Sequence, residues 1–253
     1  MCDLWRQALP FRVQPGDIPA QIDGVLTDPT AVPGEWDWIK LYNAGSFFDP
    51  GAIPRGDRKV IADQVRRFPR VIVENHPSLT DRRILPFRDQ LQCSQLEVAM
   101  GLETAHPGVL DRLNKRFNLD GFRRAADFLA CQKIDLRVFV LVKPPFLEES
   151  EALEWACRSL DFAFDCGAKV VSLIPTRTGN GAMEVLAREG VFAPPRFETL
   201  EAAFTYGLNL SRGRVFVDHW QLEQGISNPE AIHDGKPRLL RMNARQHSIE
   251  TSD

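Results

Sequence analysis

The chain has 253 residues, of which 43% are hydrophobic and 26% charged, and its formal net charge is −3 at pH 7. This length and composition suit one large α/β domain, and the small negative charge gives no basis for a nucleic-acid binder, which usually has a basic excess. No apolar run reaches the length of a membrane span and no signal peptide is visible. We therefore expect a cytoplasmic protein without membrane contact.

Short apolar segments alternate with longer amphipathic ones along most of the chain. The predicted strands are 36–42, 71–74, 96–101, 136–142, 170–174 and 215–217. The predicted helices are 18–26, 58–68, one after Ser78 or Thr80 that is broken at Pro86, 109–117, 119–132, 149–166 with Gly167 as its cap, one from Gly179-Asn180-Gly181 through Arg188, and 199–209. Residues from 221 on are expected to be polar and irregular. We expect a core domain over 1–210 and a partly irregular C-terminal extension over 211–253.

Alternation of this kind indicates parallel strands joined by helical crossovers. A barrel and a doubly wound sheet both fit, although no G-x-G-x-x-G follows a strand, which weakens a dinucleotide-binding fold. The distinctive polar residues follow the strands, where ligands of α/β folds bind. The predicted fold class is therefore α/β, a full or partial parallel barrel that is open on one side.

The five cysteines are odd in number and no two are closely spaced, which favours reduced thiols over a disulfide framework. No CxxC pair and no His–Cys cluster is present, so a complete zinc site is not expected. Cys2, in Met-Cys-Asp-Leu-Trp at the start of the chain, has by itself the simple interpretation of an exposed N-terminal thiol.

Several stretches appear in a characteristic order along the chain. They are Cys2 within Met1–Trp5, the turn Tyr42–Phe47, Glu74 at the end of a strand, the segment Leu96–Lys115, and Ser172–Pro175 followed by Gly179–Glu184. In this order the chain resembles the radical S-adenosylmethionine (SAM) superfamily, most closely the branch of the Elongator catalytic-subunit radical domain and the archaeosine-associated radical enzymes. The resemblance runs from Cys2 to about Phe204.

The resemblance implies a [4Fe–4S] cluster held by a C-x3-C-x2-C loop, with SAM on the open iron. Cys2 matches the third cysteine of that loop, and the first strand and the first two cysteines are missing from this sequence. One thiolate cannot hold a cubane cluster. We therefore expect the chain to be N-terminally truncated, with a degenerate relative as the alternative.

The resemblance also assigns cofactor contacts. The residues concerned are Asn43, Gly45, Ser46, Glu74, Glu97, Gly101, Lys115 and Ile174. The turn after strand 36–42 would contact the methionine amino group, Lys115 its carboxylate, and Ile174 the adenosine. Glu97 is expected to point into the barrel.

Simpler interpretations stay open for these residues. The turn after strand 36–42 suits an ordinary strand-to-helix connection, and Glu74 suits a structural salt bridge. Arg116 competes with Lys115 for the carboxylate. Glu103 suits a cap of the helix that follows it. The Gly179–Gly181 stretch suits either an anion site or a plain turn.

The function implied by the resemblance is reductive cleavage of SAM to methionine and a 5′-deoxyadenosyl radical. It requires an external electron donor, and the substrate, a small molecule or an RNA, is not readable from the sequence. The truncated chain itself is expected to be inactive. One alternative is a cluster-less barrel that serves as a binding or scaffold domain. Another is a metal-independent barrel enzyme that uses Lys143 with Glu97.

Overall fold

The chain was analysed as a computed structural model that describes residues 12–28, 30, 36–43 and 45–249. Its strands are β1 (Trp38–Leu41), β2 (Arg70–Glu74), β3 (Gln95–Glu103), β4 (Asp135–Val142), β5 (Val170–Pro175) and β6 (Arg214–Val217). They follow one another through a single sheet in the order β1-β2-β3-β4-β5-β6. β2 pairs in parallel with β1 and β3, and β5 pairs in parallel with β4 and β6. The predicted parallel α/β alternation is confirmed.

The helices lie between these strands and after them. They are α1 (Asp17–Thr27), α2 (Asp57–Val65), α3 (Leu85–Gln90), α4 (Pro107–Arg112), α5 (Leu119–Cys131), α6 (Glu149–Asp165), α7 (Ala182–Arg188), α8 (Phe197–Asn209) and α9 (Ile232–Arg245), with short 3-10 turns at Pro77–Leu79, Arg82–Ile84, Leu222–Gln224 and Pro229–Ala231. Gly167 follows α6 with a φ of 82°, so the predicted glycine cap is confirmed. In the part of the chain that the structure describes, none of these helices combines the length and apolarity needed to cross a bilayer.

The described residues form two compact units. The first unit consists of the residues up to Met100 together with Asp127–Leu136, and the second of Gly101–Ala126 together with the residues from Arg137 on. β3, α5 and β4 each pass from one unit to the other.

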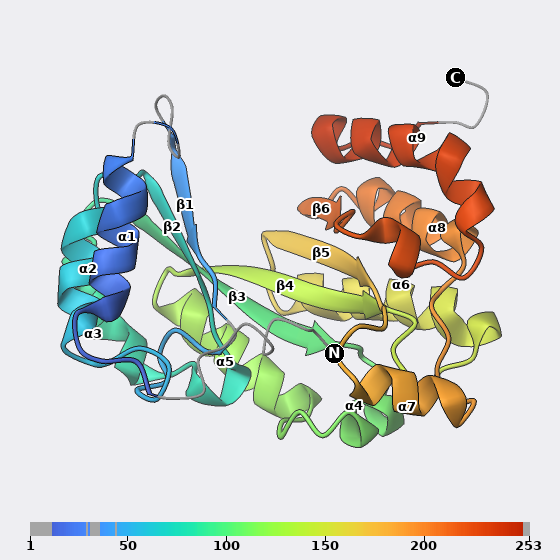
Figure 1. Ribbon diagram of the computed structural model, residues 1–253, viewed down its shortest axis with the longest axis horizontal. Helices are drawn as coiled ribbons and strands as arrows, with labels where there is room; N and C mark the ends of the chain where they lie inside the picture. The colour runs from blue at the N-terminus through green and yellow to red at the C-terminus, as the bar shows by residue number, and fades with distance from the viewer. Residues whose placement is uncertain (1–11, 29, 31–35, 44, 250–253) are drawn as a thin grey trace. The chain divides into compact units, whose positions relative to one another are not determined.

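The first unit carries β1, β2 and most of β3, with α1, α2 and α3 beside them (Figure 1). Residues paired in register across parallel strands point to the same face, so Leu41, Val73 and Val98 share one face of this sheet. Val73 and Val98 are fully buried, as are Ile61 and Val65 of α2. Val71 and Ile72 are also fully buried, so β2 is covered on both faces, as the unbroken apolar run of a parallel strand predicts.

In the second unit, α6 and α8 bury their apolar stripes beside β5 and β6 (Figure 1). Gly207 of α8 permits this approach, because a Cβ there would lie 3.1 Å from the Val215 side chain and 3.2 Å from that of Leu160. The outer edge of β6 is covered by α9. The expectation of an irregular segment is therefore wrong for Ile232–Arg245. This helix contains Gly235 and Pro237, which lower its local propensity.

Two other helix predictions are also wrong. The helix predicted over 109–117 ends at Arg112, because Asn114 and Arg116 have φ of 52° and 59°, in the left-handed region. Lys115 consequently lies in a loop rather than at a helix end. Pro86 does not break a helix but lies in the first turn of α3, where its missing N–H is tolerated.

Candidate functional site

The turn after β1, in the first unit, is tied to the end of β2. Ser46 Oγ accepts a hydrogen bond from the His76 backbone N–H at 3.0 Å, and the Phe47 N–H donates to the Glu74 carbonyl at 2.8 Å. Asn43 Oδ1 is buried and accepts no hydrogen bond from the described residues. Leaving a buried acceptor unsatisfied costs about 1–3 kcal/mol, so this oxygen is suited to accept from a bound ligand. Gly45 is exposed in the same turn.

Asn75 organises the strand ends of the first unit and was missed in the sequence. Its side chain is 2% exposed; Oδ1 accepts from the Phe48 N–H at 3.3 Å and Nδ2 donates to Thr80 Oγ1 at 2.9 Å. Its own N–H donates to the Ala99 carbonyl of β3. The sequence signal for this role was an amide residue directly after Glu74, at the end of a strand. A buried amide at such a position is normally fully hydrogen-bonded and therefore holds neighbouring segments together.

Glu97 lies near the amino end of β3, away from the carboxyl end of the strand where ligands are expected. It is 1% exposed and its Oε2 lies 2.9 Å from Arg70 Nη1, which also lies 2.6 Å from Asp135 Oδ2. Burial alone would lower the pKa of Arg70, but the hydrogen bonds and charges of Asp135 and Glu97 outweigh burial and raise it. These contacts join the amino ends of β2, β3 and β4, which is a structural role.

In the second unit, Lys115 forms an ion pair with Glu103. The prediction that Glu103 caps the helix that follows it is wrong. Lys115 Nζ lies 2.7 Å from Glu103 Oε1, and α4 is capped instead by His106, whose Nδ1 accepts from the Val109 N–H. A Cβ on Gly101 would lie 2.5 Å from the same Glu103 oxygen, so glycine leaves room for this carboxylate. Glu103 ends β3 with a φ of 67°.

Arg177 and Asp218 meet after β5 and β6, also in the second unit. Arg177 Nη1 lies 3.3 Å from Asp218 Oδ2 and 3.2 Å from the Trp220 carbonyl, and the guanidinium carbon lies 4.7 Å from the Trp220 ring centroid. This partner of Asp218 could not be predicted from the sequence. Ile174 of β5 is partly exposed, whereas Leu173 beside it is fully buried.

The Gly179–Gly181 stretch is a turn whose backbone N–H groups donate hydrogen bonds to a side chain of the helix that follows, α7. Glu184 accepts from the Gly179 N–H at 2.8 Å and from the Gly181 N–H at 2.7 Å, and Asn180 Oδ1 accepts from the Met183 N–H at 2.8 Å. Because a carboxylate of the chain itself already takes these donors, the plain-turn interpretation is confirmed.

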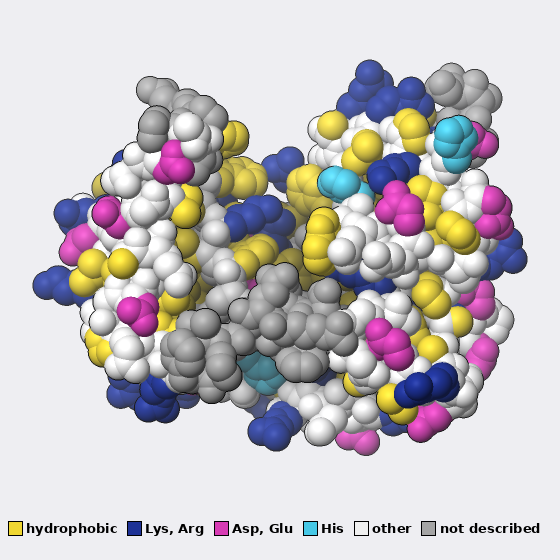
Figure 2. Space-filling view, viewed as in Figure 1, with side chains coloured by type: hydrophobic (Ala, Val, Ile, Leu, Met, Phe, Trp, Pro, Cys, Tyr) yellow, Lys and Arg dark blue, Asp and Glu magenta, His cyan; other side chains and the backbone are white. Residues whose placement is uncertain are grey.

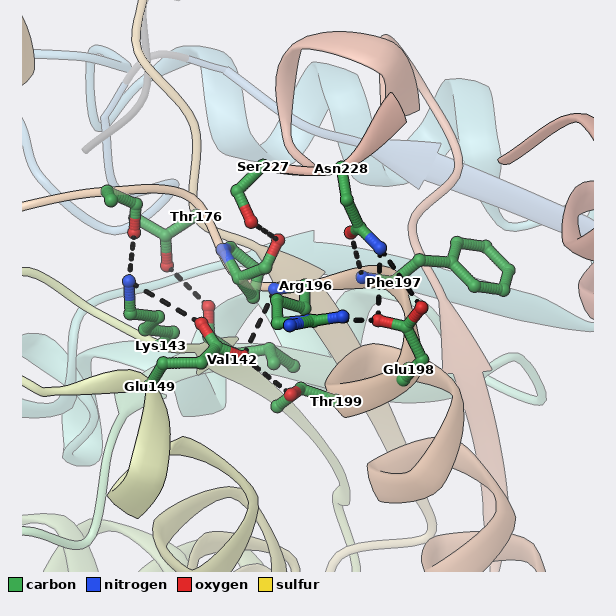
Figure 3. Close-up of polar contacts among 12 residues, drawn as sticks. Val142, Lys143, Glu149, Thr176, Arg196, Phe197, Glu198, Thr199, Ser227 and Asn228 are labelled. Carbon is green, nitrogen blue, oxygen red and sulfur yellow. Dashed lines mark hydrogen bonds and ion pairs between the residues drawn. The ribbon is translucent and has the colours of Figure 1, made fainter. Parts of the chain in front are cut away.

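The amine of Lys143, in the second unit, contacts groups of the chain itself. Its amine donates to the Ala193 carbonyl at 2.8 Å and lies 3.5 Å from Glu149 Oε2. Glu149 Oε1 in turn accepts from Thr199 Oγ1 at 2.6 Å and from the Arg196 N–H at 3.2 Å (Figure 3). The metal-independent alternative needed Lys143 with Glu97, and each of these residues has another charged partner.

Cys2 lies outside the described residues. Among the residues that the structure describes, no group of three or more His, Cys, Asp and Glu side chains could hold a metal ion. The described cysteines are Cys93, Cys131, Cys157 and Cys166, all free thiols. Burial and the Asp161 charge raise the pKa of the Cys157 thiol to about 11, which favours the unreactive protonated form.

Comparison with known proteins gives relatives but no matching family model. The archaeosine synthase subunit beta of Methanosarcina acetivorans is 29% identical over 163 residues, which cover 62% of this chain and 47% of that protein. The protein of the same name from Thermococcus kodakarensis is 28% identical over 127 residues, covering 48% and 39%. The chain thus spans less than half the length of these curated relatives.

Among solved structures, the archaeal Methanocaldococcus infernus Elp3 with an N-terminus deletion (1–46) matches with a TM-score of 0.61 at 15% identity, covering 81% of this chain and 54% of that one. This match confirms the predicted fold class, an α/β partial parallel barrel. Together with the archaeosine synthase relatives it supports the resemblance to the radical SAM superfamily.

Proposed function

We propose that this chain provides SAM-binding strand ends of a radical SAM-type domain. The observation that carries the proposal is the buried Asn43 Oδ1, which accepts no hydrogen bond from the described residues. It lies directly after β1, in the turn to which the resemblance assigns the methionine amino group. A charged ammonium donor to a buried amide oxygen contributes about 1.5–3 kcal/mol.

Lys115 keeps its assignment only as a prediction of the resemblance. In the second unit, Lys115 carries a carboxylate partner, Glu103, at 2.7 Å and is 29% exposed. Since Glu103 already takes the Lys115 amine, the proposal for SAM binding rests on the turn after β1 and not on Lys115.

The described residues do not fit the iron–sulfur cluster, because they contain no group of metal ligands. The chemistry that such a cluster would supply is a single electron for the sulfonium of SAM. We assign its ligation to residues outside the described part of the chain, Cys2 among them, and its reduction to an external electron donor. SAM cleavage to a 5′-deoxyadenosyl radical is thus a proposal that depends on ligands outside the described residues, with a small molecule or an RNA as substrate.

Ligand binding can be tested without a cluster. Titration calorimetry would measure the affinity for SAM and for S-adenosylhomocysteine in the wild type, in Asn43→Leu and in Gln21→Leu, which changes an exposed amide on α1. We expect Asn43→Leu to weaken SAM binding by about 10-fold or more, the equivalent of about 1.4 kcal/mol, and Gln21→Leu to leave it unchanged. Wild-type affinity in Asn43→Leu would refute the role of this residue.

The alternative function is a binding or scaffold domain without a cluster. Anaerobic reconstitution with iron and sulfide of a protein extended by the upstream reading frame separates the two. Cluster absorption and formation of 5′-deoxyadenosine support catalysis. Their absence, with SAM still bound, leaves only the binding function.

A further inference from the structure

Arg58, in the first turn of α2, is a buried cation with few contacts. It is 9% exposed, and among the described residues no carboxylate forms an ion pair with it. Its Nε is buried and has no hydrogen-bond acceptor. Its guanidinium makes one long hydrogen bond, from Nη2 to the Ile53 carbonyl at 3.5 Å, and stacks 5.4 Å from the ring centroid of Phe48.

The charges that act on Arg58 are mostly of its own sign. Burial lowers the pKa of Arg58 most, the charges of Arg55 and Arg83 lower it further, and Asp49 raises it by a smaller amount. Arg83 is held by Asp81 through two hydrogen bonds of 2.8 Å from its Nε and Nη2. In the space-filling view, Lys and Arg side chains gather at the end of the first unit where the loop before α2 lies (Figure 2).

This arrangement is unfavourable without a further anion. A guanidinium has five N–H donors, and buried charges in proteins are normally paired, because an unpaired one carries the full cost of desolvation. Stacking on Phe48 and one long hydrogen bond satisfy only part of this requirement. Among the described residues, Asp49 is the carboxylate that raises the Arg58 pKa, and one of its oxygens accepts from the Gly51 N–H.

We propose that Arg58, with Arg55 and Arg83 at the surface, forms a binding site for a phosphate group. A phosphate oxyanion can accept several N–H donors from guanidinium forks at once, and arginine is the side chain best shaped for such contacts. The site consists of the loop before α2, the first turn of α2 and the 3-10 turn Arg82–Ile84, and it uses none of the residues assigned to SAM. It stands or falls separately from the proposed function.

The test measures binding of inorganic phosphate by titration calorimetry and thermal shift at constant ionic strength, with chloride as the matched salt. We expect the wild type to bind phosphate and Arg58→Met, which keeps the length of the side chain, to lose about 10-fold or more in affinity. Arg88→Gln is the control, because Arg88 contacts Asp89 and the Gln132 carbonyl instead.

Exposed variants keep the test valid if Arg58→Met does not fold. Arg55→Gln and Arg83→Gln change surface positions and should each weaken phosphate binding several-fold, about the effect of one charge-assisted contact. Adenosine monophosphate and dimethyl phosphate, used beside inorganic phosphate, distinguish a monoester or free phosphate from a diester. Absence of phosphate binding in the wild type, or equal binding in wild type, Arg55→Gln, Arg58→Met and Arg83→Gln, overturns the proposal.

Discussion

Helix α9 and the residue after it cover the edge strand β6 with two side-chain amides, those of Asn243 and Gln246. Gln246 Oε1 accepts from the Val215 N–H at 3.0 Å while its Nε2 donates to the Val215 carbonyl at 2.8 Å. Asn243 does the same for Val217, with both hydrogen bonds at 2.9 Å. Each amide therefore satisfies one backbone donor and one backbone acceptor of β6, as a further strand would.

Replacing these amides by apolar side chains of similar size should destabilise the protein. Asn243→Leu removes two hydrogen bonds and Gln246→Met removes three, because Gln246 Nε2 also donates to the Asn243 carbonyl at 2.8 Å. Since a typical hydrogen bond contributes about 0.5–1.5 kcal/mol net, the expected loss in the free energy of unfolding is about 1–3 kcal/mol for Asn243→Leu, about 1.5–4.5 kcal/mol for Gln246→Met and about 2.5–7.5 kcal/mol for the pair. The values fall toward the lower end where water replaces the lost partner.

The assay is urea unfolding, combined with light scattering over a range of protein concentrations. Because an uncovered strand edge can pair with another chain, the double variant should also associate as its concentration rises. Gln224→Met, which changes an exposed amide on the turn Leu222–Gln224, is the control. A double variant within about 0.5 kcal/mol of the wild type and monomeric at all concentrations would show that these contacts do not stabilise the edge.

Two glycines and one tyrosine give further predictions. Gly101→Ala should displace the Glu103 carboxylate yet change the free energy of unfolding by less than about 1 kcal/mol, since the obstructing atom ends a flexible side chain and alanine reduces unfolded-state entropy. Gly235→Ala should destabilise by about 1–3 kcal/mol or more in the same urea assay, because its Cβ would overlap two ring carbons of Phe197, the first residue of α8. The hydrogen bond to Asp161 raises the pKa of Tyr206 from 10.0 to about 12. This contribution to stability is fully present below pH 10.0 and is lost as the pH rises to about 12. Ultraviolet titration of the two tyrosines should show one late transition, which Asp161→Asn moves toward 10.0.

The strand-and-helix alternation could be predicted because it depends on patterns of apolar and polar residues that span only a few positions. Val71-Ile72-Val73 and the run from Leu136 to Val142 are strand-like by themselves, and α6 ends where Gly167 permits a left-handed turn. Short apolar strands between amphipathic helices imply parallel pairing whatever the tertiary details. The turn after β1 could be located in the same way, because it directly follows a strand.

The partners of the site residues could not be predicted in this way, because they are distant in sequence. Lys115 and Glu103 have the same local character whether they pair with each other or with a ligand, and only the fold places them 2.7 Å apart. Glu97 belongs to a strand in either interpretation, and the sheet register decides that it lies opposite Ile72, near the amino end.

The sequence by itself determined the fold class and its order of elements, because hydrophobic periodicity and glycine positions act over a few residues. Only the tertiary structure decided that α9 forms despite Gly235 and Pro237. Burial of Leu239 and Met242, both 0% exposed, outweighs the low local helix propensity. Only the tertiary structure showed Arg58 as a buried cation that has no carboxylate partner among the described residues, because burial depends on elements that are far apart in the sequence.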